Sequence, residues 1–272
     1  MSDADRTPSV LSIAGSDSGG GAGIQADLKA FARCGVHGMT AITAITAQNT
    51  TGVTAVYPLP PEAITEQVRA VATDIGVDAV KIGMLGTAET IETVAVALDL
   101  IPAAPVVLDP VMIAESGARL LDVEALDALR STLLPRVTVV TPNLPEARIL
   151  ARDEDADPAA LARAIHALGA RAVVVTGGHR TEATDVFFDG DRWVEIPGER
   201  HPDGAAHGSG CTHSSALAAG LALGLDPLEA AENAKLIASE AVRDGLRDVG
   251  EGVGPVDAIG LARQRAGHPS VP

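Results

Sequence analysis

The chain has 272 residues, 46% of them hydrophobic, which is enough for one large α/β domain with a full core. Its formal net charge of −16 at pH 7 repels polyanions, so we expect no nucleic-acid partner. The two cysteines are too few for a disulfide scaffold, and no apolar stretch reaches the roughly 18 residues of a membrane span, so we expect a cytoplasmic protein without a membrane partner.

Short apolar or β-branched runs alternate with longer segments of helical periodicity along most of the chain. The predicted strands lie at 9–15, 38–46, 53–57, 78–84, 105–112, 137–141 and 171–178. The predicted helices between them lie at 24–34, 61–74, 87–99, 122–133, 143–151 and 158–168. Because the strands are almost continuously hydrophobic, this alternation predicts a mostly parallel sheet with helices on both faces. We expect one domain over 9–262, with flexible ends at 1–8 and 263–272.

The pattern changes in the last third of the chain. Two short strand-like runs lie within 184–198 around an Asp-Gly dipeptide, which is a typical hairpin turn. Two helices then close the fold at about 211–223 and 227–243. The second of them has Asp226 as its expected cap and Pro227 in its first turn.

A glycine-rich segment, AGSDSGGGAGIQADLKAF (14–31), follows the first predicted strand. Glycine accepts a positive φ and has no side chain, so the backbone of such a turn can approach a ligand closely. A tight strand-to-helix connection would use the same residues. The segment is neither a P-loop nor a good dinucleotide fingerprint. Asp27 lies one turn into the next helix, where its carboxylate can face a ligand or favour the positive helix end.

The segment ITAQNTTGV (45–53) places Gln48 just beyond the end of a predicted strand. In open α/β sheets, ligands bind beyond the carboxyl ends of strands. The amide of Gln48 suits a heterocycle that carries an amino group beside a ring nitrogen. The alternative is that Gln48 only satisfies loop backbone.

Carboxylates follow two further predicted strands, in LDPVM (108–112) and TPNLPEA (141–147). Asp109 lies at a strand end, and the spacing of Asn143 and Glu146 puts them on the same face of a helix. Carboxylates and an amide are good ligands for Mg²⁺, which often bridges to phosphates. Helix capping by Thr141 and Glu146 is the alternative for this segment.

The segment AAHGSGCTHSSALAAG (205–220) leads from small residues into a helix. The backbone N–H groups of Gly208, Ser209, Gly210 and Cys211 would meet where that helix begins, which predicts an anion hole. A helix N-terminus also lowers the pKa of a thiol from its reference of about 8.5, so Cys211 could act as a general base near neutral pH. A small buried cysteine in a tightly packed helix is the alternative.

Taken together and in this order, these segments resemble the ribokinase superfamily over nearly the whole chain, from Ile13 to about Pro255. The closest likeness is to the hydroxymethylpyrimidine/phosphomethylpyrimidine kinases of thiamine biosynthesis. It rests on motifs in register: AGSDSGGGAGIQADLKAF, ITAQNTTGV, KIGML, LDPVM, TPNLPEA, GGH and HGSGC.

The resemblance implies a ribokinase-like fold, a homodimer, and transfer of phosphate from ATP with Mg²⁺. The acceptors would be 4-amino-5-hydroxymethyl-2-methylpyrimidine and then its monophosphate. Cys211 would take the proton of the hydroxymethyl group beside an anion hole of Gly208, Ser209 and Gly210. The resemblance assigns Mg²⁺ to Asp109 and Glu146. It assigns the nucleotide to Asn143, Glu146, Thr176 and Gly178, and the substrate ring to Gly15, Ala22, Asp27, Gln48 and Met84.

Some residues depart from the pattern of these kinases. Thr176 stands where many of them have a lysine, so a cationic phosphate contact is missing there, and Arg180 is the nearest candidate to replace it.

A pyridoxal kinase of the cysteine-containing branch is a rival interpretation, which Gln48 disfavours. A non-catalytic pyrimidine sensor is another, against which the retained Asp109, Glu146 and Cys211 weigh. A thiol-nucleophile hydrolase would need a paired histidine, which the sequence does not define.

Overall fold

The computed structural model describes residues 6–113, 117, 119–177 and 183–262. Most of the expected flexible ends, 1–5 and 263–272, lie outside the described residues, as do Gly178 and Arg180. Within the described ranges, no helix is both long and apolar enough to cross a membrane.

The strands form a nine-stranded sheet in the order β3-β2-β1-β4-β5-β6-β7-β8-β9. The six adjacent strands β2, β1, β4, β5, β6 and β7 run parallel. Strand β3 is antiparallel to β2, and β8 is antiparallel to both β7 and β9. The predicted mostly parallel sheet and late hairpin are therefore confirmed. The bounds are β1 (Ser9–Asp17), β2 (His37–Asn49), β3 (Gly52–Pro58), β4 (Ala79–Ile82), β5 (Val106–Leu108), β6 (Val139–Val140), β7 (Ala172–Val175), β8 (Asp185–Phe188) and β9 (Trp193–Ile196).

Two central strands are shorter than predicted, because β5 and β6 both end just before a proline segment. The N–H of Asp109 still donates to the carbonyl of Ile82 at 2.8 Å, and that of Thr141 to the carbonyl of Leu108 at 2.9 Å. Pro110 and Pro142 then have no N–H with which to extend the ladder. The chain therefore leaves the sheet at Asp109 and Thr141, at the carboxyl edge.

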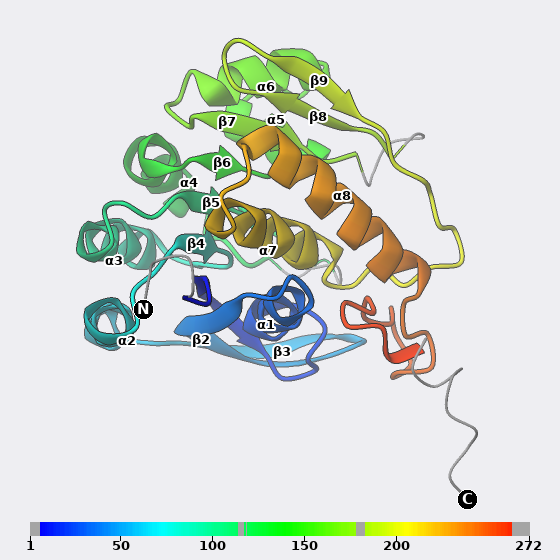
Figure 1. Ribbon diagram of the computed structural model, residues 1–272, viewed down its shortest axis with the longest axis horizontal. Helices are drawn as coiled ribbons and strands as arrows, with labels where there is room; N and C mark the ends of the chain where they lie inside the picture. The colour runs from blue at the N-terminus through cyan, green and yellow to red at the C-terminus, as the bar shows by residue number, and fades with distance from the viewer. Residues whose placement is uncertain (1–5, 114–116, 118, 178–182, 263–272) are drawn as a thin grey trace, which may run out of the picture.

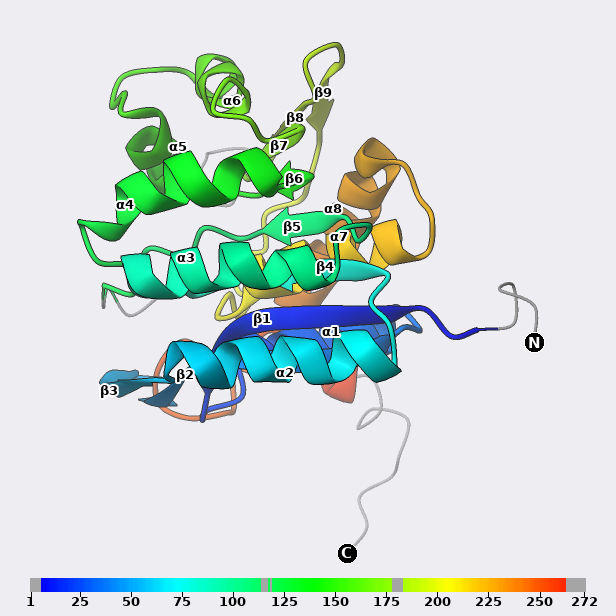
Figure 2. The same cartoon turned by 90° about the vertical axis from the view of Figure 1, so that its left-hand side faces the viewer.

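Helices cover both faces of the sheet, with α2 to α6 on one face and α1, α7 and α8 on the other (Figures 1 and 2). The predicted helix at 122–133 is α-helical only over α4 and continues as a π-helical segment, Leu129–Leu133, before Pro135. The bounds are α1 (Gly23–Arg33), α2 (Pro61–Asp74), α3 (Ala88–Ala97), α4 (Ala125–Ala128), α5 (Leu144–Ala151), α6 (Pro158–His166), α7 (Ser209–Ala222) and α8 (Pro227–Arg243).

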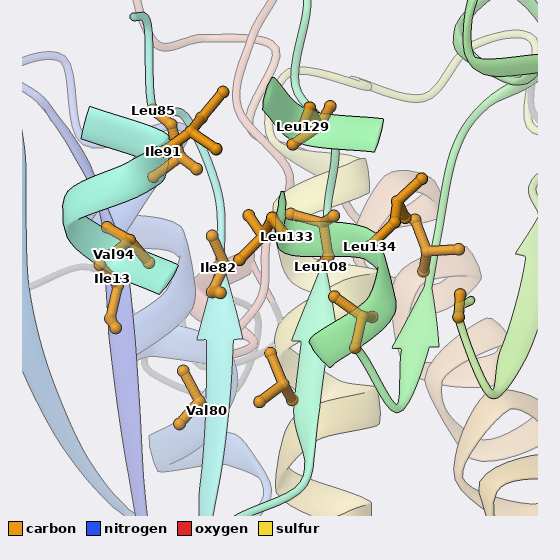
Figure 3. Packing of buried hydrophobic residues seen from close by; sticks show 14 of the residues in the cluster. Ile13, Val80, Ile82, Leu85, Ile91, Val94, Leu108, Leu129, Leu133 and Leu134 are labelled. Carbon is orange, nitrogen blue, oxygen red and sulfur yellow. The ribbon is translucent and has the colours of Figure 1, made fainter. Parts of the chain in front are cut away.

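Because successive side chains along a strand point to opposite faces of the sheet, the core has two layers. Ile13, Ile82 and Leu108 point toward α3 and the π-helical segment, where large aliphatic side chains fill the space (Figure 3). On the opposite face, residues such as Val107 pack against the alanines of α7 and α8. Small side chains let these two helices pack closely against the sheet. This packing fixes the position of α7, and therefore of the first turn that lines the site.

The chain reverses its direction of travel across the sheet at β1. Helix α1 carries the chain from β1 to β2 on one face, whereas the connections through α2 to α6 lie on the other. The boundary between β1 and β4 is therefore a topological switch point. In open α/β sheets, ligands bind outside the carboxyl ends of the strands at such a point.

Candidate active site

A cavity of about 640 Å³ lies at the carboxyl ends of the parallel strands. Residues at or just beyond the carboxyl ends of β1, β2, β4, β5, β6 and β7 contribute to its wall, together with the first turn of α7. Apart from Asp27, every predicted site residue that the structure describes lines this one cavity: Gly15, Ala22, Gln48, Met84, Asp109, Asn143, Glu146, Thr176, Gly208, Ser209, Gly210 and Cys211.

The loop before α7 has the backbone geometry of an anion site. Gly208 adopts a φ of 85°, and a Cβ there would collide with the carbonyl of Gly21, so only glycine fits. Among the described residues, the N–H groups of Gly210 and Cys211 have no hydrogen-bond acceptor, as expected in the first turn of a helix. The expectation for Ser209 is corrected, because its N–H already donates to the carbonyl of Ala206 at 2.9 Å.

The thiol of Cys211 lies at the cavity wall and accepts a hydrogen bond from the N–H of Gly23. Burial raises its pKa to about 12, with the charge of Lys81 opposing and those of Asp109 and Asp27 adding to the increase. The expected lowering of this pKa is therefore wrong for the ligand-free protein, because burial and nearby carboxylates outweigh the helix end. At neutral pH the group is a thiol.

Asp27 does not face the cavity, contrary to its assignment to the substrate site. Its side chain is fully buried and accepts hydrogen bonds from Lys81 Nζ at 2.9 Å, Ser12 Oγ at 2.6 Å and Ser215 Oγ at 2.7 Å. These contacts occupy its carboxylate, so it cannot bind a substrate directly. Its role is to hold the lysine.

Lys81 is a site residue that the sequence reasoning missed. It is fully buried, and its charge lies near Cys211 and Asp109 at the floor of the cavity. Burial favours the neutral amine, but the charges of Asp27, Cys211 and Asp109 outweigh it and raise the pKa of Lys81. The signal in the sequence was a charged residue inside the otherwise apolar run at 79–85.

Asp109 and Glu146 are both buried at the cavity wall. Burial and the charge of Asp109 raise the pKa of Glu146 to about 8. Burial also raises the pKa of Asp109, which Lys81 and Ser214 partly oppose. Glu146 and Asn143 form a capping box, with both backbone-to-side-chain distances at 2.9 Å. The capping alternative is thus confirmed for Glu146 but not for Thr141, whose hydroxyl donates to the carbonyl of Leu108, and both Asn143 and Glu146 nevertheless line the cavity.

Two buried carboxylates whose charges repel are a suitable pair for a divalent cation. Oxygen donors are the ligands that Mg²⁺ prefers, and it commonly keeps waters and phosphate oxygens as its remaining ligands. In the described part of the chain, no group of three or more His, Cys, Asp or Glu residues could hold a metal. Asp109 and Glu146 therefore fit Mg²⁺ with water and phosphate, and they do not fit a metal that needs a full set of protein ligands.

The other end of the cavity is lined by Gly15, Ala22, Gln48 and Met84. A Cβ at Gly15 would meet the methyl group of Met84 at 2.5 Å, so the glycine makes room for that side chain. The amide oxygen of Gln48 accepts a hydrogen bond from Thr46 Oγ1 at 3.1 Å. The NH₂ group of Gln48 donates to none of the described residues, which leaves it for a ligand.

Asp17, which the sequence reasoning did not single out, and His207 join the two halves of this wall. The carboxylate of Asp17 accepts the N–H groups of Gly19, Gly21 and Ala22 at 2.8 to 3.0 Å, and His207 Nε2 lies 3.1 Å from it. Burial opposes ionisation, but these hydrogen bonds lower the pKa of Asp17. The glycine-rich loop is therefore fixed to the loop that precedes α7.

The fold and this site define a small-molecule kinase with a ribokinase-like fold. The model of the phosphomethylpyrimidine kinase family matches residues 17–257. The chain is 52% identical to a hydroxymethylpyrimidine/phosphomethylpyrimidine kinase of Rhizobium meliloti, over 92% of this chain and 96% of that protein. It is 45% identical to the thiamine biosynthesis bifunctional protein ThiED of Geobacter sulfurreducens, over 92% of this chain and 52% of that protein. The chain belongs to the phosphomethylpyrimidine kinase family.

Solved structures of two related kinases have the same fold. An ADP complex of Bacillus subtilis pyridoxal kinase is 38% identical and has a TM-score of 0.86, over 95% of this chain and 99% of that one. A phosphomethylpyrimidine kinase of Clostridium difficile is 41% identical and has a TM-score of 0.76, over 86% of this chain and 99% of that one. The shape of the backbone thus matches kinases for two different rings.

Proposed function

We propose that this kinase transfers the γ-phosphoryl group of ATP to the hydroxymethyl group of 4-amino-5-hydroxymethyl-2-methylpyrimidine, and then phosphorylates the monophosphate to give the diphosphate. The observation that carries the proposal is the meeting of three groups in one cavity. Cys211 lies beside the first-turn amides of α7, the buried carboxylates of Asp109 and Glu146 lie nearby, and Gln48 lies at the ring end.

Each group has a defined task in such a transfer. Phosphoryl transfer needs mainly correct positions and neutralisation of the negative charge that moves. Free N–H groups at the start of α7 would hold the transferred phosphoryl group. Mg²⁺, held by Asp109 and Glu146, would supply positive charge to the phosphates. Gln48 would donate from its NH₂ group to a ring nitrogen, so that the hydroxymethyl group faces Cys211.

The proton of the alcohol would go to Cys211 Sγ. This needs the thiolate, and the pKa of about 12 in the ligand-free protein means that a small fraction is ionised at neutral pH. The Lys81 cation and the first-turn amides are the groups that favour the thiolate. The second step has a phosphate oxygen as its acceptor, which already carries negative charge, so it has no comparable need for a base.

Pyridoxal phosphorylation is the second candidate, because the backbone matches a pyridoxal kinase with a TM-score of 0.86. Turnover of the aminopyrimidine alcohol and of pyridoxal by the same preparation separates the two. We expect the higher kcat/KM for the aminopyrimidine, since Gln48 offers a donor for its ring edge. A higher value for pyridoxal would reverse the assignment.

We further propose that the protein works as a homodimer in the cytoplasm. Edge strand β3 exposes Val56 and Tyr57, which are 43% and 62% exposed, and an apolar edge of this kind supports a subunit contact. Both cysteines are free thiols, which supports a reducing compartment. Light scattering after gel filtration tests the dimer, and a monomer mass at micromolar concentration would contradict it.

A further inference from the structure

Gln48, at the ring end of the cavity, is held by hydrogen bonds at both its backbone and its side chain. It lies near the end of β2, which is placed between β1 and β3 at one end of the sheet (Figure 2). The register of β2 with β3 shifts between Ala47 and Gln48. Bulges of this kind redirect side chains and are frequent next to active sites. The regular pairing of the sheet is therefore interrupted at the residue proposed to contact the ring.

Ser18, in the glycine-rich turn after β1, holds the backbone of Gln48. Its hydroxyl donates to the carbonyl of Gln48 at 2.6 Å and accepts the N–H of Gln48 at 2.9 Å. One side chain thus bonds both backbone polar groups of this residue. Ser18 is exposed and does not line the cavity, so its effect on a ligand would pass through Gln48.

Thr46 holds the side chain of the same glutamine. It is 4% exposed, and its Oγ1 lies 3.1 Å from Gln48 Oε1 and 2.9 Å from the carbonyl oxygen of Ser16. A hydroxyl has one hydrogen, and both of these neighbours are acceptors. The hydrogen of Thr46 is therefore used within the protein and is not offered to a ligand, although Thr46 lines the cavity. Its polar effect on a ligand would also pass through Gln48.

The bond from Thr46 decides which end of the Gln48 amide lies where. With Oε1 at Thr46, the NH₂ group is the end that remains for a ligand, and Oε1 keeps a second lone pair. An amide that is free to turn by 180° would exchange these two ends. A ring that carries an amino group beside a ring nitrogen fits an acceptor and a donor in one order only. Fixing that order beforehand reduces the entropy that is lost on binding.

We propose that Thr46 and Ser18 are positioning residues for recognition of the aminopyrimidine, because together they fix the place and the order in which Gln48 presents its acceptor and its donor. Ser18 fixes the backbone and Thr46 fixes the amide. A ring without the amino group uses only part of this arrangement, so the two residues favour the aminopyrimidine over it. The inference rests on the proposed function in that Gln48 contacts the ring.

Binding of 4-amino-5-hydroxymethyl-2-methylpyrimidine to Thr46→Val, measured by calorimetry on the full chain, tests the role of the hydroxyl. We expect about threefold to tenfold weaker binding, the effect of losing one hydrogen bond. Thr46→Ser keeps the hydroxyl and should bind nearly as the wild type does. Thr90→Val is the matched control, because Thr90 is 5% exposed and does not line the cavity, and its affinity should be unchanged.

The same pyrimidine without its amino group separates positioning from direct packing. In Thr46→Val we expect it to lose less affinity than the aminopyrimidine, because it depends less on the orientation of the amide. Equal losses for the two rings would show that Thr46 acts by packing against the ring, and unchanged affinity for the aminopyrimidine would also overturn the proposal.

Gln48→Leu provides the background in which both positioning residues should lose their effect. In that background we expect Thr46→Val and Ser18→Ala to leave the affinity for the aminopyrimidine unchanged, whereas Ser18→Ala alone should weaken it about threefold to tenfold. Losses that simply add would overturn the proposal. Ser131→Ala removes another exposed hydroxyl and should have no effect.

Binding of the non-hydrolysable nucleotide AMP-PCP with Mg²⁺ should be unchanged in these variants, which shows that the fold and the nucleotide end are intact. Because Ser18 is exposed, Ser18→Ala leaves the core unchanged and tests the proposal even where Thr46→Val lowers stability. An equal loss of AMP-PCP affinity in Ser18→Ala would show a general structural effect and overturn its assignment.

The failure of this inference is distinguishable from failure of the proposed function. Aminopyrimidine binding that depends on Thr46 and Ser18, in a protein that does not phosphorylate this ring, supports the inference and refutes the proposed reaction. Phosphorylation of the aminopyrimidine together with an affinity that ignores both residues refutes the inference alone.

Discussion

The two buried aspartates on either side of α7 differ in how completely they are bonded. Asp27 is surrounded by a lysine and two serine hydroxyls, all within 2.9 Å. Asp185 has Lys235 and one backbone N–H on one oxygen, whereas the other oxygen has no hydrogen bond within the described residues and lies 3.5 Å from His213 Nε2. The first cluster is complete before any ligand arrives and supports the catalytic end. The second lacks a hydrogen bond on one oxygen and lines the cavity.

Removal of the charge at the complete cluster should give the largest change in stability. In Lys81→Met, Asp27 would be left as a buried carboxylate without its cation, so we expect the free energy of unfolding to fall by about 3–5 kcal/mol. Urea denaturation followed by circular dichroism measures it.

Asp185→Asn removes the carboxylate charge at the incomplete cluster, where the side chain of Lys235 is 12% exposed, so water can solvate the ammonium group that loses its partner. We expect a smaller loss, about 1–3 kcal/mol. Equal losses for the two variants would remove the distinction between the clusters.

The next loss of stability is expected at the contact between the glycine-rich loop and the loop that precedes α7. Gly208→Ala adds a Cβ at a positive φ and against the carbonyl of Gly21. Gly224 has a similar φ of 86°, with nothing within 4 Å of an added Cβ. We expect Gly224→Ala to lower the free energy of unfolding by about 1 kcal/mol and Gly208→Ala by about 2–3 kcal/mol. The same loss in both would mean that the two loops do not press on each other.

The raised pKa of Cys211 predicts a pH dependence for its reactivity. Thiolate is the reactive form, so alkylation of the ligand-free protein by iodoacetamide should accelerate about tenfold per pH unit between pH 7 and pH 10. Peptide mass spectrometry separates Cys211 from Cys34, whose pKa burial also raises. A rate that levels off near pH 8.5 or below would show that burial does not control this thiol.

Much of the fold could be predicted from local patterns. The hydrophobic runs predicted the parallel sheet and most helices, and α8 begins at its expected cap, Asp226. The predicted helix at 122–133 was only partly right, because the change to π-helical geometry in front of Pro135 depends on local packing and not on periodicity. Short strands before Pro110 and Pro142 were overextended because apolar character continues past the last ladder bond.

The site could be predicted where its residues are neighbours in the sequence. It was less predictable where burial in the folded protein determines the contacts or the pKa of a side chain. Gly208 and Cys211 were found from a contiguous motif. Asp27 was misplaced because one buried lysine, 54 residues away, turns it from the cavity. The pKa of Cys211 had the wrong sign because desolvation in the folded core outweighs the helix end, and a sequence does not show desolvation.

The central claim, that Cys211 takes the proton of the alcohol, is tested most directly by following both phosphoryl transfers in Cys211→Ala. We expect kcat for the aminopyrimidine alcohol to fall by about 10²–10⁴, the usual contribution of a general base, and kcat for the monophosphate to fall less than about tenfold. Intact Mg²⁺-AMP-PCP binding would show that the nucleotide end is preserved. Equal losses in both transfers, or no loss in the first, would contradict the account.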